Sequence, residues 1–446
     1  MKLLYRIMAI VPLVLTGALG AIAQNERGVV ESEEESQFSL LRDSTLKILE
    51  EEFIDGTEEP SLQESGSVFS VKGFVDTYHA MRSASPHDFL SSRTRVRGEA
   101  ELKIDRSSLF VSLNAQYNPI IKEANGFQLR EAYFDYREDH WGIRLGRQLV
   151  IWGAADGIRI TDVVSPMDMT EFLAQDYDDI RMPVNALRGF LYNETFKLEL
   201  LAIPFFEGFK LPIQPTNPWS LLANQSMPMP IRWQEERSHP AFTLKNVEYG
   251  GRLSATLPGI DFSFSALHTW NKRPVINQLP GSNEILLRPE YFRMGFVGAD
   301  ISKPLEEFVL RGEVAYNIDK HFVREQGCNT IHWLIGADWY APNDWILMAQ
   351  ISCEHLLNPP VGLTSKQDFI ATLHLSKKLF SNTLQLSNFT YLDLDGMSWF
   401  SRFSADYALS DQIHLMAGYD WFHGDKGYFG LFQKNSEGWI KAKYSF

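Results

Sequence analysis

The sequence has little cysteine and, beyond its first residues, no long hydrophobic run. Its 446 residues include only two cysteines, Cys328 and Cys353. Two cysteines cannot form a disulfide framework, so size or a membrane must stabilise the fold. After residue 21, no apolar stretch approaches the ~20 residues that a transmembrane helix requires. Aromatic residues nevertheless make up 13% of the chain, although its mean hydropathy is −0.20.

The first 23 residues have the pattern of a secretory signal peptide. Met1, Lys2 and Arg6 give a positive start, and residues 7–21 are apolar. Small residues at 21 and 23 then predict cleavage before Gln24, with an uncleaved anchor as the alternative. No cysteine lies near the cleavage point, which argues against a lipoprotein. An exported, aromatic-rich chain without helical spans is either a large periplasmic domain or a β-barrel.

Residues 24–66 form an acidic leader with 13 Asp and Glu against three Arg and Lys. The runs at 33–35 and 50–52 are typical of solvated or disordered charge. Ser44 could cap a short helix with Leu46, Leu49 and Phe53 on one face. Two interpretations stay open, a flexible periplasmic leader and a short helix for oligomerisation or partner docking.

From Val68 onward the hydrophobic pattern has period two. In the segment 93–104, every odd position is charged and every even position is small or apolar except Thr94. The alternation recurs in segments that begin near Ser108, Phe308 and Ile331. Repeated alternating segments of ~10 residues, separated by turns, are typical of a membrane barrel.

The connections between these segments alternate between short and long. About 18 strands are expected. Counted along the chain, the even-numbered connections between them are tight, such as 105–106 and 303–304, and most odd-numbered ones are longer, notably 153–186, 204–246 and 272–288. Outer-membrane barrels have short periplasmic turns, longer external loops and an even strand number. The sequence therefore predicts an all-β fold, a transmembrane antiparallel up-and-down barrel over residues 67–446.

The last strand carries a specific signal. Phe446, Tyr444, Ala442 and Ile440 alternate with polar residues, and a terminal aromatic on such a strand resembles the recognition signal of the barrel-assembly machinery. We therefore expect Phe446 and Tyr444 to be the assembly signal. The expected location is the outer membrane of a Gram-negative bacterium, in contact with lipid and lipopolysaccharide, with both termini in the periplasm.

A barrel of this size has an interior too wide for wall side chains to fill, so we expect an aqueous, charged lumen. The candidate lumen and selectivity residues are Arg93, Arg95, Arg97, Glu99, Glu101, Arg144, Arg147, Arg252, Arg311 and Arg402. Such arginines could steer anions. The alternative, which the mixture of acids and bases on the same strands favours, is that they pair across neighbouring strands and stiffen the wall.

The segment 153–186 is the most informative loop, because long loops in compact proteins are usually functional or mobile. The candidate constriction residues are Trp152, Asp156, Arg159, Asp162, Asp168, Asp176 and Arg181. Calcium binding by Asp156, Asp176, Asp178 and Asp179 matches no known loop spacing, so no metal is predicted. The second loop, 204–246, is rich in proline and aromatic residues. It could contact an amphiphilic substrate, although a lid packed on its own side chains is favoured.

A family resemblance rests on three stretches of sequence. The run 129–133 (Leu-Arg-Glu-Ala-Tyr), then 145–148 with Trp152-Gly153, and finally Ser165-Pro166-Met167-Asp168 resemble a family of poorly characterised bacterial barrels. That family is allied to the alginate-export and substrate-specific porin barrels. The resemblance covers roughly residues 127–185 and implies an 18-stranded outer-membrane channel. It assigns no transport residues, and the sequence lacks a long arginine-lysine run that would argue for alginate.

Three classes of function compete. The favoured one is a channel or porin for small hydrophilic solutes, anionic or amphiphilic ones included, through a charged lumen gated by long external loops. The others are a structural or adhesive barrel or an outer-membrane partner of an exporter, and, less favoured, an outer-membrane enzyme such as a phospholipase or protease. We expect no catalytic residues, no cofactor and no nucleic-acid partner. The oligomeric state stays open, a homo-oligomer included.

Overall fold

The computed structural model describes residues 67–446, apart from 154, 156, 175–176, 221–230, 235–238, 280–283, 362 and 364. The expected signal peptide and acidic leader lie outside the described residues. No helix in the described part of the chain is long and apolar enough to cross a membrane.

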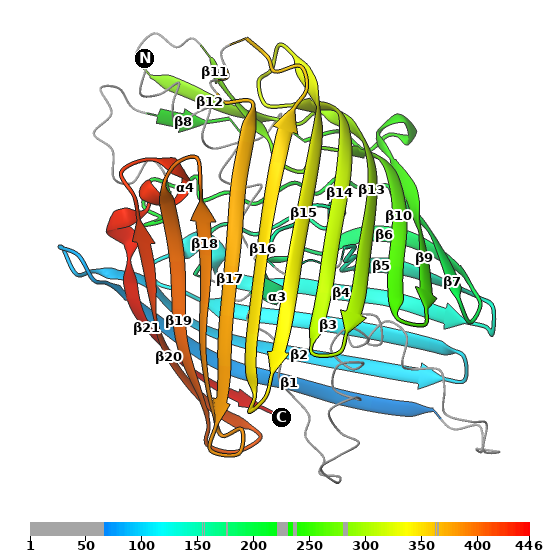
Figure 1. Cartoon of the computed structure of the whole chain (residues 1–446), viewed down its shortest axis with the longest axis horizontal. Helices are drawn as coiled ribbons and strands as arrows, with labels where there is room; N and C mark the ends of the chain where they lie inside the picture. The colour runs from blue at the N-terminus through cyan, green and yellow to red at the C-terminus, as the bar shows by residue number, and fades with distance from the viewer. Residues whose placement is uncertain are drawn as a thin grey trace.

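Eighteen antiparallel strands form one closed sheet (Figure 1). They are β1 (Val68–Arg82), β2 (Phe89–Ile104), β3 (Ser107–Tyr117), β4 (Gly126–Arg137), β5 (Trp141–Gln148), β6 (Val184–Tyr192), β7 (Phe196–Ile203), β9 (Glu248–Leu257), β10 (Ile260–Trp270), β13 (Arg293–Leu305), β14 (Phe308–His321), β15 (Gly327–Ala341), β16 (Trp345–Leu356), β17 (Gln367–Leu379), β18 (Leu384–Asp393), β19 (Ser398–Ala408), β20 (Ile413–His423) and β21 (Glu437–Ser445). The last strand pairs with the first, from Phe74↔Ser445 to Arg82↔Glu437. The predicted fold class and strand number are therefore confirmed.

The period-two pattern separates the two faces of the wall. In β2, Arg95 is 3% exposed and Val96 is 41% exposed. In β14, Leu310 is exposed while Arg311 is buried. Successive side chains of a strand point to opposite faces, so the apolar residues form the outer surface and the charged ones point inward. An apolar outer band is what a lipid bilayer requires of a barrel.

Tight turns and long connections lie at opposite ends of the barrel, as the sequence predicts (Figure 1). The turns at one end contain two to four residues, for example 105–106 between β2 and β3. The start of β1 and the end of β21 lie at this same end, because Val68 pairs with Lys103 and Ile413 with Tyr444. The long connections 149–183, 204–247 and 271–292 all leave the other end.

The long connections carry structure of their own. The end of the barrel from which the long connections leave is called the open end below. There, a three-stranded sheet is formed by β8 (Ile231–Trp233), β11 (Val275–Leu279) and β12 (Ile285–Glu290). The short helices are η1 (Lys122–Ala124), α3 (Tyr177–Ile180), η2 (Leu244–Asn246), α4 (Gly427–Gly430) and η3 (Gln433–Asn435). The small sheet buries Ile276, Ile285 and Leu287 against Leu211 and Trp233. The long connections at this end thus contain packed structure of their own.

The interior holds an apolar core, which the sequence analysis did not anticipate. Residues of the connection 149–183, such as Ile158 and Phe172, pack in one cluster with Phe389, Phe400 and Phe422 of the wall. These wall residues lie on the inward faces of β18, β19 and β20. The expected charged interior is therefore incomplete, because a folded loop fills part of the interior and packs on an apolar surface of the wall.

Candidate functional site

The connection between β5 and β6, residues 149–183, is called the inner loop here. It follows Gln148 at the open end and packs against the interior of the barrel. Leu149 donates its backbone N–H to Glu131 of β4 at 2.8 Å. The hydroxyl of Tyr391 in β18 donates to the Gly157 carbonyl at 3.2 Å, and Arg402 of β19 donates to the Leu173 carbonyl at 3.4 Å. These contacts fix the inner loop to several sides of the wall.

Glu313 of β14 fixes the first part of the inner loop. Its carboxylate accepts the backbone N–H groups of Ala155 at 2.7 Å and Thr161 at 3.0 Å, and the Thr161 hydroxyl at 3.0 Å. Gly153 makes this approach possible, because a Cβ there would lie 2.9 Å from the Glu313 carboxylate and its φ is +98°. A buried carboxylate that accepts several hydrogen bonds is stabilised in its charged form, so Glu313 holds a turn of the loop against the wall.

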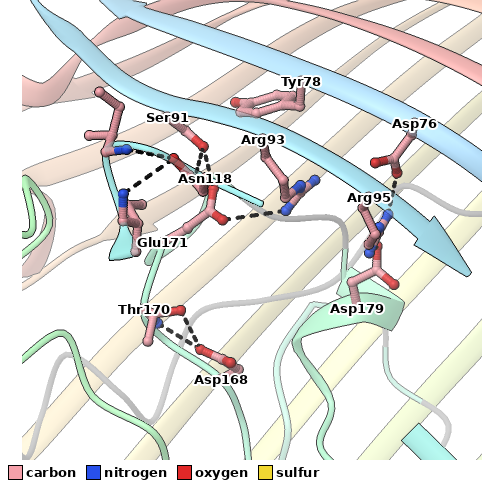
Figure 2. A network of polar contacts seen from close by, with 12 residues as sticks. Asp76, Tyr78, Ser91, Arg93, Arg95, Asn118, Asp168, Thr170, Glu171 and Asp179 are labelled. Carbon is pink, nitrogen blue, oxygen red and sulfur yellow. Dashed lines mark hydrogen bonds and ion pairs between the residues drawn. The ribbon is translucent and has the colours of Figure 1, made fainter. Parts of the chain in front are cut away.

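The second part of the inner loop meets the arginines of β2 (Figure 2). Glu171 lies 3.4 Å from Arg93 and accepts the Ser91 hydroxyl at 2.9 Å. Asp179 of α3 lies 2.6 Å from both Arg95 and Arg97. The two acids and three arginines, Glu171, Asp179, Arg93, Arg95 and Arg97, are called the latch below.

Two arginines of the latch stabilise the charged form of the Asp179 carboxylate. Burial alone would raise the pKa of Asp179, but Arg95 and Arg97 outweigh that effect and hold the pKa well below its usual range. Arg95 also pairs with Asp76 of β1, its direct partner across the two strands. Removing one member of such a buried set leaves uncompensated charge, which costs far more than an exposed pair contributes.

Most of the predicted lumen arginines pair with wall carboxylates. The pairs are Arg144–Asp135 at 3.0 Å, Arg252–Asp300 at 3.2 Å, Arg311–Asp338 at 2.6 Å and Arg402–Asp420 at 3.1 Å. Asp135 and Asp420 are the direct cross-strand partners of their arginines. For these four arginines the contacts are those expected if charged residues pair across strands and stiffen the wall.

Of the remaining lumen candidates, Glu99 and Glu101 lie nearer the tight-turn end of the barrel, and Arg147 does not. Glu99 lies 3.6 Å from the exposed Lys72, and Glu101 lies 3.9 Å from Lys103. Arg147 was placed on the wrong side of the wall. It pairs in register with Ala132 and shares the outward parity of Leu145, and its guanidinium lies 3.0 Å from Glu207.

The predicted constriction residues stabilise the inner loop itself. Asp162 lies 3.0 Å from Arg159 and 3.1 Å from Arg181, and accepts the Trp152 N–H at 3.2 Å. Trp152 is buried, and its ring N–H donates to Glu199 of β7 at 3.3 Å. Asp168 caps a turn by accepting both donors of Thr170, and it pairs with Lys210 at 3.1 Å.

The remaining candidates of this loop are only partly described. Asp156 and Asp176 lie outside the described residues. Asp179, which the calcium alternative included, is engaged by arginines instead. Among the residues that the structure describes, no group of three or more His, Cys, Asp or Glu could hold a metal ion.

The second long connection also reaches the interior. Trp219 is fully buried, and its ring lies 6.2 Å from that of Phe172 in the inner loop. Phe172 stacks on Phe432, with ring centroids 4.1 Å apart, and Asn435 donates to the Pro218 carbonyl at 2.9 Å. The expected lid packed on its own side chains is thus incomplete, because Trp219 packs on two other connections. Its Met227 and Met229 lie outside the described residues.

Comparisons with known proteins agree with this architecture. A family model described as "Protein of unknown function (DUF1302)" matches residues 5–445. Among solved structures, Pseudomonas aeruginosa OccK5 (OpdH) is similar, with a TM-score of 0.51 and 9% identity over 85% of this chain and 97% of that one. An anion-selective porin from Comamonas acidovorans has a TM-score of 0.43 and 12% identity, over 85% of this chain and 100% of that one. No curated protein sequence matches.

The likeness to OccK5 shows a shared β-barrel fold and no more, because the identity is only 9%. The match fits the expected family of poorly characterised barrels. The expected alliance with alginate-export barrels is not confirmed by these comparisons.

Proposed function

We propose that this chain, which belongs to the family described as "Protein of unknown function (DUF1302)", is an outer-membrane channel for small solutes, with the inner loop as its gate. In this proposal the docked inner loop is the closed state of the gate. The open end would face the outside of the cell. The tight turns, and with them the start of β1 and the end of β21, would face the periplasm.

The observation that carries this proposal is a folded loop attached to the inside of a closed wall by side-chain contacts. An 18-stranded barrel has an interior wider than its own side chains can fill. Here the inner loop occupies part of that space, and its contacts with β2, β14 and β19 include hydrogen bonds and ion pairs to wall side chains. Contacts of this kind can break without disturbing the ladder of the barrel.

The composition of the gate favours hydrophilic or amphiphilic solutes. Ion pairs on the β2 side would be replaced by water when the loop moves, which exposes Arg93, Arg95 and Arg97 to the lumen. On β19 and β20, which follow β2 around the wall after β1 and β21, movement would expose the aromatic residues Phe400 and Phe422. An opened lumen would thus have a cationic stretch and an aromatic stretch side by side on the same part of its wall.

Conductance in planar lipid bilayers tests the proposal. The full-length purified protein should show rare openings, and the double variant Glu171→Gln/Asp179→Asn should open more often, because both latch carboxylates are neutralised. The matched control is Glu325→Gln, an exposed acid of the β14–β15 connection. No conductance from either the native protein or the double variant would refute the channel and favour a structural barrel or an exporter partner. Hydrolysis of the bilayer lipid would favour an enzyme.

A further inference from the structure

One turn of the second long connection lies inside the barrel and contacts three other connections of the open end. It comprises residues 214–220 and is called the Trp219 turn here. Two backbone hydrogen bonds close it, from the Asn217 N–H to the Gln214 carbonyl at 2.9 Å and from the Ser220 N–H to the Asn217 carbonyl at 3.0 Å. Asn217 and Trp219 are both fully buried. A buried turn needs partners for its polar groups, and those partners show what the turn holds in place.

Asn217 joins the inner loop to the connection between β3 and β4. Its amide nitrogen donates to the Glu123 carboxylate at 2.7 Å and to the Thr170 carbonyl at 2.9 Å. Its amide oxygen accepts the Trp219 backbone N–H at 2.9 Å. Glu123 belongs to η1 of the β3–β4 connection, and Thr170 belongs to the inner loop. An amide has both the two donors and the acceptor that this arrangement needs, so Asn217 binds two connections at once.

The Trp219 ring packs between the inner loop, the connection between β20 and β21, and the wall. Its centroid lies 6.2 Å from that of Phe172 in the inner loop and 6.1 Å from that of Phe432, and these two rings stack on each other. The ring of Phe422, on the inward face of β20, lies 5.8 Å away. Aromatic pairs at such distances attract each other beyond the burial of their surface. Removal of the indole ring would therefore take away part of the surface that holds Phe172.

The Trp219 turn and β2 hold three consecutive residues of the inner loop. Thr170 and Phe172 contact the Trp219 turn. Glu171, which lies between them in the sequence, contacts Arg93 and Ser91 of β2 (Figure 2). Because consecutive residues of a chain are covalently tied, a restraint on Thr170 and Phe172 also keeps Glu171 beside β2. One contact of the latch is thus supported by another connection of the barrel.

We propose that the Trp219 turn is a lock on the gate, so that the inner loop undocks only after this turn has left its place. The inference rests on the proposed channel and adds to the latch a second restraint that can be removed separately. The connection that carries the lock also forms β8 of the three-stranded sheet at the open end. Opening of the gate is thereby made dependent on a connection that has structure on both the inner and the outer side.

Single-channel recording of the full-length protein in planar lipid bilayers, together with limited proteolysis in detergent, tests the lock. Asn217→Asp keeps the size of the side chain but replaces the amide donors by a carboxylate that faces the Glu123 carboxylate and the Thr170 carbonyl. The frequency of openings and the rate of cleavage between residues 149 and 183 should both rise at least about tenfold, because two buried acceptors lose their donor. Asn217→Ala, which removes the donors without adding charge, should act in the same direction.

A second substitution should restore the lock. In Asn217→Asp/Glu123→Gln the donor and the acceptor change places, so one of the two hydrogen bonds is recovered and both rates should fall back towards the native values. Asn246→Asp is the matched control, because the Asn246 amide donates to the Ala241 carbonyl within the same connection at 2.8 Å. It removes a hydrogen bond of that connection without touching the inner loop, and should leave both rates unchanged.

The lock and the channel fail separately. Native rates of opening and cleavage in Asn217→Asp, with the folded barrel confirmed by heat-modifiable migration on gels, would overturn the lock. Equal effects of Asn217→Asp and Asn246→Asp, or no recovery in the double variant, would also overturn it. Faster cleavage in Asn217→Asp without conductance in any variant would keep the lock and refute the channel. Frequent openings in Glu171→Gln/Asp179→Asn, but native openings in Asn217→Asp, would keep the channel and refute the lock.

Discussion

Asp179 of the inner loop and Arg95 of β2 lie 2.6 Å apart inside the barrel, although 84 positions of sequence separate them. Arg95 has Asp76 as a second partner, and Asp179 has Arg97. The pair therefore joins the inner loop to the place where β1 and β2 pair with each other. It is one of the ion pairs that couple the wall to the proposed gate.

Neutralising Asp179 should release the latch. Asp179→Asn leaves Arg95 and Arg97 with less compensation, and breaking a buried pair of this kind costs about 3–5 kcal/mol. A loss of about 3 kcal/mol would raise the population of the undocked loop by about a hundredfold. Limited proteolysis of the purified barrel measures this as faster cleavage between residues 149 and 183. Cleavage of Glu325→Gln at the native rate is the control, and equal rates for both variants would contradict the latch.

The pH dependence of gating follows from the lowered pKa of Asp179. A carboxylate whose pKa is depressed in the docked state stabilises docking above its ordinary pKa, near 3.8, and loses that contribution as pH falls through the docked value. The latch should thus stay closed from pH 8 to pH 5 and open only well below pH 4. Bilayer conductance recorded across this range checks the sign. An opening between pH 5 and pH 7 that persists in Asp179→Asn would assign the response to another group.

The wall pair Arg402–Asp420 should contribute to stability more than an exposed pair. Asp420 is fully buried and also accepts the ring N–H of Trp439 at 3.0 Å. Arg402→Met should lower the free energy of unfolding by about 3–5 kcal/mol, and the double variant Arg402→Met/Asp420→Leu should recover much of it. Lys72→Met, which breaks an exposed pair with Glu99, should change it by less than about 1 kcal/mol. Urea unfolding in detergent measures all three, and equal effects of both single variants would argue against the difference.

The terminal aromatic residue should matter for assembly more than its local contacts suggest. Phe446 exchanges two backbone hydrogen bonds of 2.9 Å with Gly73, and its ring is half exposed. Phe446→Ser keeps those backbone bonds, so a loss of folded barrel from the outer membrane would point to recognition during assembly. Heat-modifiable migration on gels measures the folded fraction. Phe127→Ser, at a 94% exposed phenylalanine, is the control, and equal yields for both variants would remove the assembly role.

The wall of the barrel could be predicted from the sequence because its information is local. Alternation in a segment such as 93–104 fixes which face each residue occupies, and the lengths of the connections fix which end each loop leaves. The same parity rule would have placed Arg147 outside, since it lies three positions from the inward-facing Arg144. Counting inward positions in β18–β20 would also have found Phe389, Phe400 and Phe422.

The partners of the inner loop could not be predicted in the same way. Glu313 and Asp179 find their partners across the interior, at separations that no local pattern records. Three of the predicted constriction residues, Asp162, Arg159 and Arg181, do meet, but they form a cluster within the loop.

The orientation of the barrel can be tested with single cysteines, because both native thiols, Cys328 and Cys353, are buried and free. Val361→Cys places a thiol on the β16–β17 connection at the open end, at a residue that is 95% exposed. Phe380→Cys places one in a tight turn at the other end, at a residue that is 75% exposed. A membrane-impermeant maleimide added to intact cells should label the first variant and leave the second unlabelled until the outer membrane is broken. The reverse pattern would place the tight turns outside and move the proposed gate to the periplasmic mouth.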